Sequence, residues 1–288
     1  MHKILAKQLL SSTNNMNLYR GCTHGCIYCD SRSTCYQMNH DFEDVAVKIN
    51  APELLEKILS NKRKRCMIGT GAMCDPYLHI EKELKLTRKC LEIINRYNFG
   101  VGVLTKSDLV MRDIDLFESI NSKTKAVVQM TLTTFDDELC KKIEPNVCPT
   151  SSRIKVLQEM KKAGIPTMVW LDPFLPFIND TQQNIKNLLD VCLFVGVKGI
   201  MCFGIGVTLR DGNREYFYNQ LDKEFPGLSD CYRKKFGNAY EIWSPNHKEL
   251  FSLIEKTCTK YNILYKPQDC FDYLNRFEDK KSVQFELF

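Results

Sequence analysis

The sequence has no long uninterrupted apolar segment. Its most apolar window, residues 188–207, contains Asp190, Lys198 and several glycines, which predicts a helix end, a turn and a buried strand rather than a membrane span. The first ten residues carry too short an apolar run for a signal peptide. Internal repeats and low-complexity tracts are also lacking, beyond an alternation of strand and helix patterns. We therefore expect a cytoplasmic protein that does not enter a membrane.

The sequence also has little excess charge of either sign. It has 40 basic and 35 acidic residues among 288, a net charge of +5. This small basic excess is compatible with binding to a phosphate backbone, but many proteins that never contact nucleic acid share it. Because 44% of the residues are hydrophobic and 26% are charged, the composition is that of an ordinary folded protein and argues against extensive disorder.

Cysteine, in contrast, is abundant, with 14 residues in the chain. Without a secretion signal or regular spacing, this number fits a reducing cytosol better than a disulfide scaffold. Cys22, Cys26 and Cys29 follow the spacing Cys-x3-Cys-x2-Cys, and Gly21 and Gly25 permit the tight backbone of a loop around a metal centre. Three thiolates can hold three corners of a [4Fe–4S] cluster and leave the fourth iron open to a small molecule.

Two other interpretations of these cysteines stay open at this point. Free cysteine packs as a small hydrophobic side chain, so the three thiols can be purely structural. They can also bind zinc, with His24, Cys35 or His40 as the fourth ligand. Zinc sites more often combine two Cys-x2-Cys-like units, or one such unit with a later pair of histidines, and the sequence shows no second unit at a fixed offset.

The segment 17–30 resembles the cluster-binding motif of the radical S-adenosylmethionine (SAM) superfamily. Its flanks, over residues 19–33, are similar to the spore photoproduct lyase-like branch, and the resemblance extends over most of the chain. It implies that Cys22, Cys26 and Cys29 hold a [4Fe–4S] cluster whose open iron binds SAM. An electron from a donor such as flavodoxin or ferredoxin would cleave SAM to a 5′-deoxyadenosyl radical, which would abstract hydrogen from a substrate.

Six short apolar runs alternate with helical patterns, which predicts an α/β fold. Helices are expected from Pro52, over residues 81–97, from Thr150 or Ser151 to Gly164, and after a cap at Asp180. The resemblance implies a (β/α)6 partial TIM-type barrel over residues 1–212. We expect a C-terminal helical cap over 213–280 and an exposed tail over 281–288. The predicted strands are residues 16–20, 66–69, 99–104, 126–132, 165–171 and 198–203.

Ligands of such barrels meet the loops that follow the strands. The second of these loops contains Gly69, Thr70 and Gly71, whose backbone the resemblance places along the methionine part of SAM, and Asp75, which offers a carboxylate. Lys106, in the third loop, is expected to meet the carboxylate of SAM or a substrate phosphate.

Two later loops supply further polar candidates. Thr131 and Thr133 share one face of the fourth strand end and are expected to bind the ribose or the amino-acid end of SAM. Arg210 and Arg214 follow the sixth strand and are predicted to bind substrate phosphates.

Hydrogen return to the product radical is assigned, by the resemblance, to Cys74 and Tyr28. The lyases carry their cysteine three positions before the aspartate, where this chain has Ala72, whereas Cys74 stands one position before it. The lyases also have a second tyrosine where this chain has Asp30. These departures concern the repair of spore photoproduct itself. In the fifth loop, Phe174 and Phe177 are candidates for stacking on adenine or on a substrate base.

The C-terminal segment resembles a sliding-clamp-binding peptide through Gln284, Leu287 and Phe288. Together these features predict a radical SAM enzyme that acts on a nucleic acid, with a DNA lesion as the expected substrate and DNA and the sliding clamp as expected partners. The alternatives are radical SAM modification of a peptide or RNA, and a non-catalytic iron–sulfur or zinc protein that binds DNA and the clamp.

Overall fold

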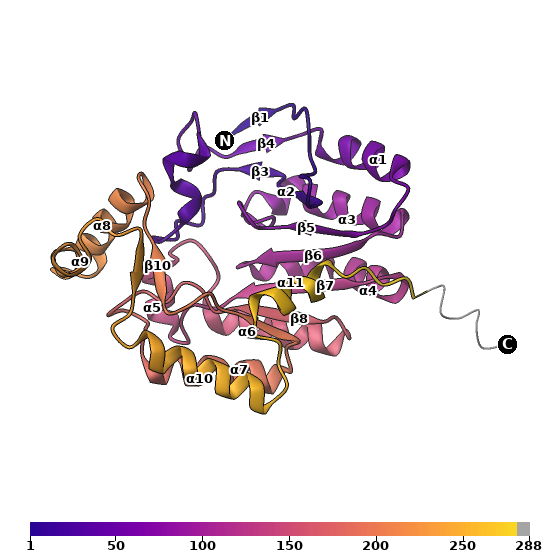
Figure 1. The fold of residues 1–288 in the computed structure, drawn as a ribbon. Helices are drawn as coiled ribbons and strands as arrows, with labels where there is room; N and C mark the ends of the chain where they lie inside the picture. Colours follow the sequence, from indigo (N-terminus) through magenta and orange to yellow (C-terminus); the bar gives the residue numbers. More distant parts are fainter. Residues whose placement is uncertain (281–288) are drawn as a thin grey trace.

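The computed structural model describes residues 1–280. Its centre is a sheet of six parallel strands in the order β2-β5-β6-β7-β8-β9 (Figure 1), which confirms the predicted α/β class. The order follows the sequence without reversal, so each strand is added beside the previous one, as in a barrel that stays open between β2 and β9. The strands are β2 (Asn15–Met16), β5 (Met67–Thr70), β6 (Gly100–Thr105), β7 (Ala126–Thr131), β8 (Thr167–Trp170) and β9 (Gly199–Met201).

The predicted first strand, residues 16–20, is divided between two sheets. Met16 pairs with Thr70 in the central sheet, whereas β3 (Tyr19–Arg20) pairs antiparallel with β4 (Ala46–Lys48). β1 (His2–Ile4) joins β4 on its other side. The chain therefore leaves the central sheet just before the cysteine loop, a change of partner that the apolar run does not reveal.

Helices cover the outer face of the central sheet (Figure 1). Among them, α4 and α5 were not predicted, and α7 begins after Thr181, whose hydroxyl accepts the N–H of Asn184 at 3.2 Å, so the predicted cap at Asp180 is wrong by one residue. The helices of this layer are α1 (Ala51–Asn61), α2 (Glu81–Leu84), α3 (Leu86–Arg96), α4 (Ile114–Lys123), α5 (Asp137–Ile143), α6 (Thr150–Lys162) and α7 (Gln182–Val195).

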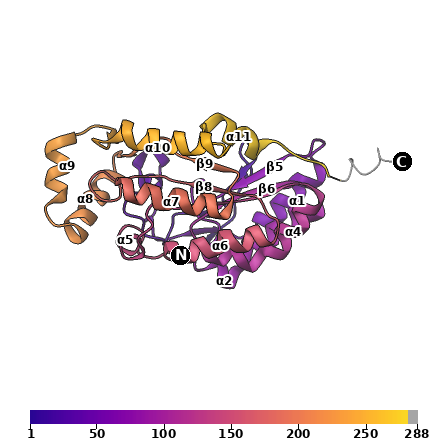
Figure 2. The same ribbon diagram turned by 90° about the horizontal axis from the view of Figure 1, so that it is seen from below.

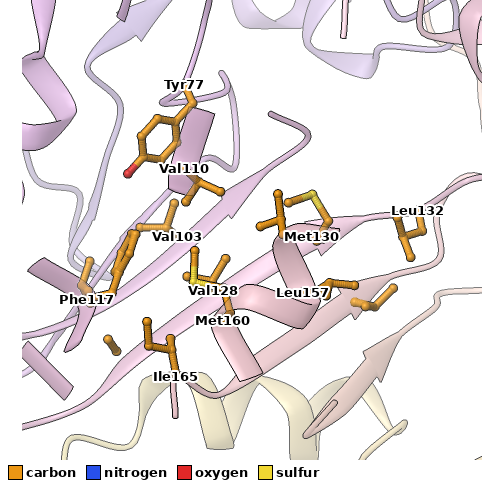
Figure 3. Packing of buried hydrophobic residues seen from close by; sticks show 14 of the residues in the cluster. Tyr77, Val103, Val110, Phe117, Val128, Met130, Leu132, Leu157, Met160 and Ile165 are labelled. Atoms are coloured by element: carbon orange, nitrogen blue, oxygen red, sulfur yellow. The ribbon is translucent and has the colours of Figure 1, made fainter. Parts of the chain in front are cut away.

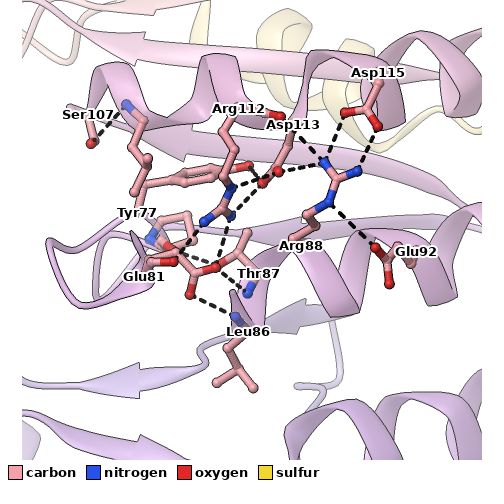
Figure 4. A network of polar contacts seen from close by, with 12 residues as sticks. Tyr77, Glu81, Leu86, Thr87, Arg88, Glu92, Ser107, Arg112, Asp113 and Asp115 are labelled. Atoms are coloured by element: carbon pink, nitrogen blue, oxygen red, sulfur yellow. Dashed lines mark hydrogen bonds and ion pairs between the residues drawn. The ribbon is translucent and has the colours of Figure 1, made fainter. Parts of the chain in front are cut away.

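The helix predicted over residues 81–97 is interrupted at Lys85, which has a left-handed backbone (φ 49°). The buried carboxylate of Glu81 accepts the N–H groups of Leu86 (3.0 Å) and Thr87 (2.9 Å) and so caps α3. Arg112 balances this charge at 3.0 Å within a larger polar network (Figure 4). Because the side chain of Glu81, five and six residues upstream, satisfies these two donors, the chain starts a new helix here instead of continuing the old one.

The hydrophobic core lies between the sheet and the outer helices (Figure 3). Val128 and Met130 of β7 lie beside Met160 and Leu157 of α6, and Val103 of β6 lies beside Val110 and Phe117. Side chains alternate along a strand, so the neighbours of these residues face the concave side. There Val127, Met168 and Met201 form a separate buried cluster with Cys270 and Leu274.

The C-terminal part of the chain packs around the barrel in three places. α8 and α9 share one apolar cluster with the cysteine loop, next to the two-stranded sheet of β10 and β11. α10 packs on α7, and α11 packs on β9 (Figure 2). Leu264 also extends the central sheet through backbone bonds with Ile200 and Lys198. The elements are β10 (Gly206–Thr208), α8 (Asn213–Glu224), α9 (Leu228–Phe236), β11 (Glu241–Trp243), α10 (His247–Lys260) and α11 (Pro267–Asn275).

Lys125, at the N-terminal end of β7, binds residues of the last described segment. Its ammonium group donates to the carbonyl of Tyr273 at 2.6 Å and pairs with Glu278 at 3.1 Å. Lys280 donates its backbone N–H to Lys123, so residue 280 lies at the opposite end of the strands from the cysteine loop (Figure 1). None of the helices in residues 1–280 is long and apolar enough to cross a membrane.

Candidate active site

A cavity of about 400 Å³ opens at the C-terminal ends of the parallel strands. The ends of β6, β7 and β8 contribute Lys106, Thr131 and Trp170 to its wall. The cysteine loop closes one side, and Trp243 of β11 stands on another. This is the edge at which the loops of an α/β barrel gather their functional side chains.

Cys22, Cys26 and Cys29 all line this cavity. The loop that carries them is held by main-chain bonds, including Ile27 N–H to the carbonyl of Ile143 at 3.0 Å. Gly21 has a φ of 86°, and a Cβ at this position would lie 2.4 Å from the carbonyl oxygen of Phe42, so only glycine fits. Protein contacts alone therefore define the backbone path of this loop.

The donor set fits a cluster with one open iron. Three thiols from one loop face a shared cavity that has room beside them, and soft thiolates are the ligands that iron–sulfur clusters take. Within residues 1–280, no three His, Cys, Asp or Glu side chains come together as a site for a single metal ion. Of the fourth ligands considered for zinc, His24 faces Asp75 at 3.6 Å, and Cys35 contacts Arg210 at 3.3 Å.

Asp75 ties the second and third loops together. Its carboxylate accepts the hydroxyl of Thr105 and the backbone N–H of Lys106, each at 2.7 Å, and the N–H of Tyr77 at 2.8 Å. Three donors on one carboxylate fix its orientation, and the remaining edge faces the cavity near His24. Asp75 therefore positions the Lys106 segment as well as offering a charge.

The charged side chains of Glu144, Arg153 and Lys106 lie next to the cysteine loop. Glu144 and Arg153 have fully buried side chains and pair at 2.6 Å. Burial alone would raise the pKa of Glu144, but Arg153 and Lys106 more than offset it, so its pKa lies below the ordinary value. Burial would lower the pKa of Lys106, but Cys26 and Glu144 raise it instead. Lys106 thus keeps its charge in an enclosed place beside the thiols.

The two residues predicted to return hydrogen differ in their surroundings. The Tyr28 hydroxyl donates to Glu144, so its proton points away from the cavity that the ring lines. The Cys74 thiol donates to the carbonyl of Gly21 at 2.8 Å and lies next to Cys22. Both side chains line the cavity, and the sulfur of Cys74 lies beside the backbone of the cysteine loop.

The residues predicted to bind SAM separate into two groups. Gly71 and Thr131 line the cavity, as do Asp75 and Lys106. Gly69, Thr70 and Thr133 do not appear in its wall: a Cβ on Gly69 would lie 1.9 Å from Oδ1 of Asn15, and both threonine hydroxyls are buried without a hydrogen-bond partner in the described chain.

The two predicted phosphate ligands lie outside the cavity wall. Arg210 pairs with Asp30 at 3.3 Å and donates to the Tyr240 hydroxyl at 2.6 Å, beside the rim. Arg214 donates to a set of backbone carbonyls, the shortest bond being 2.6 Å to Leu209. Arg214 therefore holds residues 237–239, which follow α9, close to Leu209, whereas Arg210 lies beside the cavity rim. Gln284, Leu287 and Phe288 of the predicted clamp-binding peptide lie outside the described residues.

Several residues in the cavity wall were not singled out from the sequence. Asp172, Phe203 and Trp243 line it, whereas Phe174 is buried in the core and Phe177 packs against Phe236 of α9. Asp172 directly follows a predicted strand, a position that could have marked it, whereas Phe203 was included in the predicted strand 198–203 and lies beyond the end of β9 (Gly199–Met201). Trp243 comes from β11, a short strand beyond the barrel that no pattern in the sequence announced.

A family model described as the radical SAM superfamily matches residues 16–192, which is more than half of the chain. The chain belongs to the radical SAM superfamily. Its cofactors are accordingly a [4Fe–4S] cluster and SAM. The Cys-x3-Cys-x2-Cys loop lies within the matched residues and lines the cavity.

Sequence relatives are distant, and several of them have no assigned activity. An uncharacterized protein of Mycobacterium tuberculosis is 26% identical over 264 residues, covering 86% of this chain and 77% of the relative. An uncharacterized protein of Methanocaldococcus jannaschii is 34% identical over 188 residues, covering 62% and 70%. A radical SAM Nalpha-GlyT isomerase of Pseudomonas phage M6 is 22% identical over 256 residues, covering 88% and 52%.

Solved structures share the fold. A spore photoproduct lyase variant with bound AdoMet and dinucleoside spore photoproduct has a TM-score of 0.65 at 14% identity, covering 92% of this chain and 80% of that one. The radical SAM methyltransferase TsrM from Kitasatospora setae, with cobalamin and a [4Fe–4S] cluster, has a TM-score of 0.51 at 12% identity, covering 88% and 53%. The partial-barrel architecture that the resemblance implied is thereby confirmed, and this chain's fold is like that of the spore photoproduct lyases.

Proposed function

We propose that this radical SAM enzyme abstracts hydrogen from a nucleic-acid substrate, with a damaged or modified DNA base as the substrate class. The observation that carries the proposal is the single cavity in which the cluster thiols and exposed aromatic side chains meet. Phe203 and Trp243 are 52% and 42% exposed, although aromatic side chains of this size are usually well buried. Aromatic faces beside a reactive centre suit unstacked bases.

Two further features support a nucleic-acid substrate. Arg210 and Tyr240 lie together near the entrance, where a guanidinium group and a ring can meet a phosphate and a sugar. The fold is also that of spore photoproduct lyases, one of which was solved with a dinucleoside spore photoproduct. A base in a duplex must leave the stack to reach such a cavity, which costs a few kcal/mol and favours a lesion or a modified base.

When bound, the cluster and SAM supply a 5′-deoxyadenosyl radical, chemistry that belongs to the cofactors. The chain contributes their placement. Cys22, Cys26 and Cys29 hold the cluster, and the segment at Gly71 allows the backbone to approach the methionine part of SAM. Lys106 offers a charge that its buried neighbours maintain, and Thr131 offers a hydroxyl at the strand end.

Cys74 is proposed as the hydrogen donor to the product radical. A thiol has a weak S–H bond, and this sulfur borders the cavity next to Cys22. Tyr28 lines the same cavity and is proposed to take part in the hydrogen return together with Cys74, with its hydroxyl held by Glu144.

The test begins with 5′-deoxyadenosine release by the anaerobically reconstituted protein under dithionite. Release is expected from the wild type and none from Cys26→Ala, with Cys231→Ala, an exposed cysteine outside this cavity, as the matched control that keeps activity. Damaged oligonucleotides and oligopeptides are then compared for stimulated release and for deuterium transfer from labelled substrate. Stimulation by peptides alone would contradict the nucleic-acid assignment, and absence of release from a fully loaded cluster would contradict the enzyme itself.

Two partners complete the proposal. A small electron-transfer protein of the flavodoxin or ferredoxin type is proposed as the reductant, and it should replace dithionite in the release assay. The segment with Gln284, Leu287 and Phe288 is proposed to bind the DNA sliding clamp. Retention of the purified clamp by the wild type, but not by a Leu287→Ala/Phe288→Ala variant, is the expected result, and equal retention would refute this role.

A further inference from the structure

The last turn of α9 carries three consecutive basic side chains, Arg233, Lys234 and Lys235. All three are exposed, and the helix has one acidic residue, Asp230, against them. Among residues 1–280 the structure records no ion pair for any of the three. Basic residues at the C-terminal end of a helix also favour its dipole, so their position alone does not mark a binding surface.

Aromatic rings hold two of these side chains in place. The guanidinium carbon of Arg233 lies 4.4 Å from the ring centre of Tyr218, and the ammonium nitrogen of Lys235 lies 5.0 Å from that of Phe177. Such contacts orient a cation without neutralising its charge. Phe177 has a left-handed backbone (φ 65°), which bulky residues seldom adopt, and its ring is 41% exposed. The cations are therefore presented at the surface with their full charge.

The chain runs from this helix end directly to the cavity. Residues 237–240 are exposed and include no acidic side chain, and the next residue, Glu241, lines the cavity. Arg214 fixes the path of this segment through the carbonyls of residues 237–239. We call residues 233–240 the basic turn. It begins on α9, which lies at the end of the molecule opposite α1 and α4 (Figure 2).

The span of the basic turn suits a short stretch of a DNA strand. Six residue steps separate Lys235 from Glu241, which limits the distance between their Cα atoms to about 22 Å. A strand of B-form DNA advances about 3.4 Å per nucleotide, so roughly six nucleotides cover this distance. Arg210, which donates to the hydroxyl of Tyr240 at 2.6 Å, adds a further cation near the cavity end of the span.

We propose that the basic turn binds the phosphate backbone of the DNA strand that carries the target base, within about six nucleotides of that base. Phosphate contacts of this kind position a nucleic acid without reading its sequence. An acidic protein partner would not need a row of cations that leads into the cavity, so the arrangement favours a strand whose base enters it. The inference rests on the proposed function, because it takes DNA as the substrate.

The experiment measures binding of a fluorescein-labelled, undamaged DNA duplex of about 20 base pairs by anisotropy, using the reconstituted, SAM-bound protein between about 50 and about 200 mM salt. Each neutralised phosphate contributes about 0.9 to the slope of log Kd against log salt concentration. Arg233→Gln/Lys234→Gln/Lys235→Gln is therefore expected to lower this slope by about 1.8–2.7, since two or three of the side chains contact phosphates. Lys234→Gln alone should lower it by about 0.9.

The matched control is Lys62→Gln/Arg63→Gln/Lys64→Gln, which removes as many basic residues after α1, before β5 begins. Its slope is expected to equal that of the wild type. Glutamine keeps a good helix propensity, and Tm and iron content show whether each variant is folded and loaded.

An unchanged slope in the basic-turn variant overturns the inference, and a lower Tm beside it would show that these residues only stabilise α9. An equal fall in slope for both triple variants also overturns it, because overall charge then explains the binding. Slower reduction of the cluster by flavodoxin, with an unchanged slope for DNA, would assign the basic turn to the electron donor instead. These outcomes refute the inference alone, whereas absence of duplex binding by the wild type at the lowest salt concentration contradicts a DNA substrate as well.

Discussion

Replacing Glu144 by alanine is expected to destabilise the protein strongly. Its side chain and that of Arg153 are both fully buried, with 2.6 Å between the charged atoms. The same carboxylate accepts the hydroxyl of Tyr28 and balances the charge of Lys106. Its removal leaves a guanidinium and an ammonium group enclosed without a counter-charge, directly beneath Cys26.

The expected size follows from the burial. Removing one member of a buried ion pair costs about 3–5 kcal/mol, because the remaining charge stays desolvated. The lost bond to the tyrosine hydroxyl adds about 1 kcal/mol. Since each kcal/mol lowers Tm by roughly 2–4 °C in a protein approaching this length, we expect Glu144→Ala to lower Tm by about 10 °C. Iron incorporation should fall as well, because the carboxylate supports the cysteine loop.

The assay is anaerobic thermal unfolding of the reconstituted protein followed by circular dichroism. Glu159→Ala is the matched control, since Glu159 pairs with Lys162 on the surface of α6 and such pairs contribute less than about 1 kcal/mol. A double variant, Glu144→Gln/Arg153→Met, removes both charges and should recover part of the loss. A Tm for Glu144→Ala within about 2 °C of the wild type would refute the buried ion pair.

Three further predictions follow from the cavity and its glycines. Gly71→Ala should lower the free energy of unfolding by more than about 3 kcal/mol, because its Cβ would lie 2.0 Å from the carbonyl oxygen of Leu104. Gly164→Ala, which has open space around its Cβ, should lower it by only about 1–2 kcal/mol through backbone strain. Equal losses for the two variants in chemical denaturation would contradict this prediction. Burial raises the pKa of Asp172 in the folded state, whereas the unfolded chain loses this proton above about pH 4, so the contribution of Asp172 to the free energy of unfolding falls as pH rises. The Tm difference in favour of Asp172→Asn should therefore grow from about pH 4 to about pH 7. A constant Tm difference would show that this pKa is not raised. Cys74→Ser should keep cluster iron and substrate-free 5′-deoxyadenosine release but fail to quench the substrate radical, and a loss of iron would instead make Cys74 structural.

Most strands were predictable because they are continuous apolar runs between turns. β7 and β8 lie inside their predicted ranges, and β6 ends one residue beyond its predicted range. The break at Lys85 was not predictable, because the periodicity of residues 81–97 continues through it. The reason for the break is the buried carboxylate of Glu81, whose bonds to Leu86 and Thr87 arise only when the loop folds back.

Some residues of the candidate site could also be predicted from the sequence, and others could not. Residues that follow strands, such as Asp75 and Lys106, were identified because parallel strands end at one edge. Glu144 and Trp243 reach the site from elements that no strand rule connects with it. Arg214 satisfied the rule, yet its guanidinium is engaged by backbone carbonyls, a competition that sequence position does not show.

The concave face of the sheet acquires its cover late in synthesis. Val127 and Met168 belong to the first two thirds of the chain, but Cys270 and Leu274 of α11 bury them. A ribosome-bound chain that has reached residue 260 has made every barrel strand and still presents this apolar face to water. Incomplete chains of this kind are prone to aggregate and to bind chaperones. The order in which the polypeptide emerges therefore leaves an interval, before α11 appears, in which this apolar face has no cover.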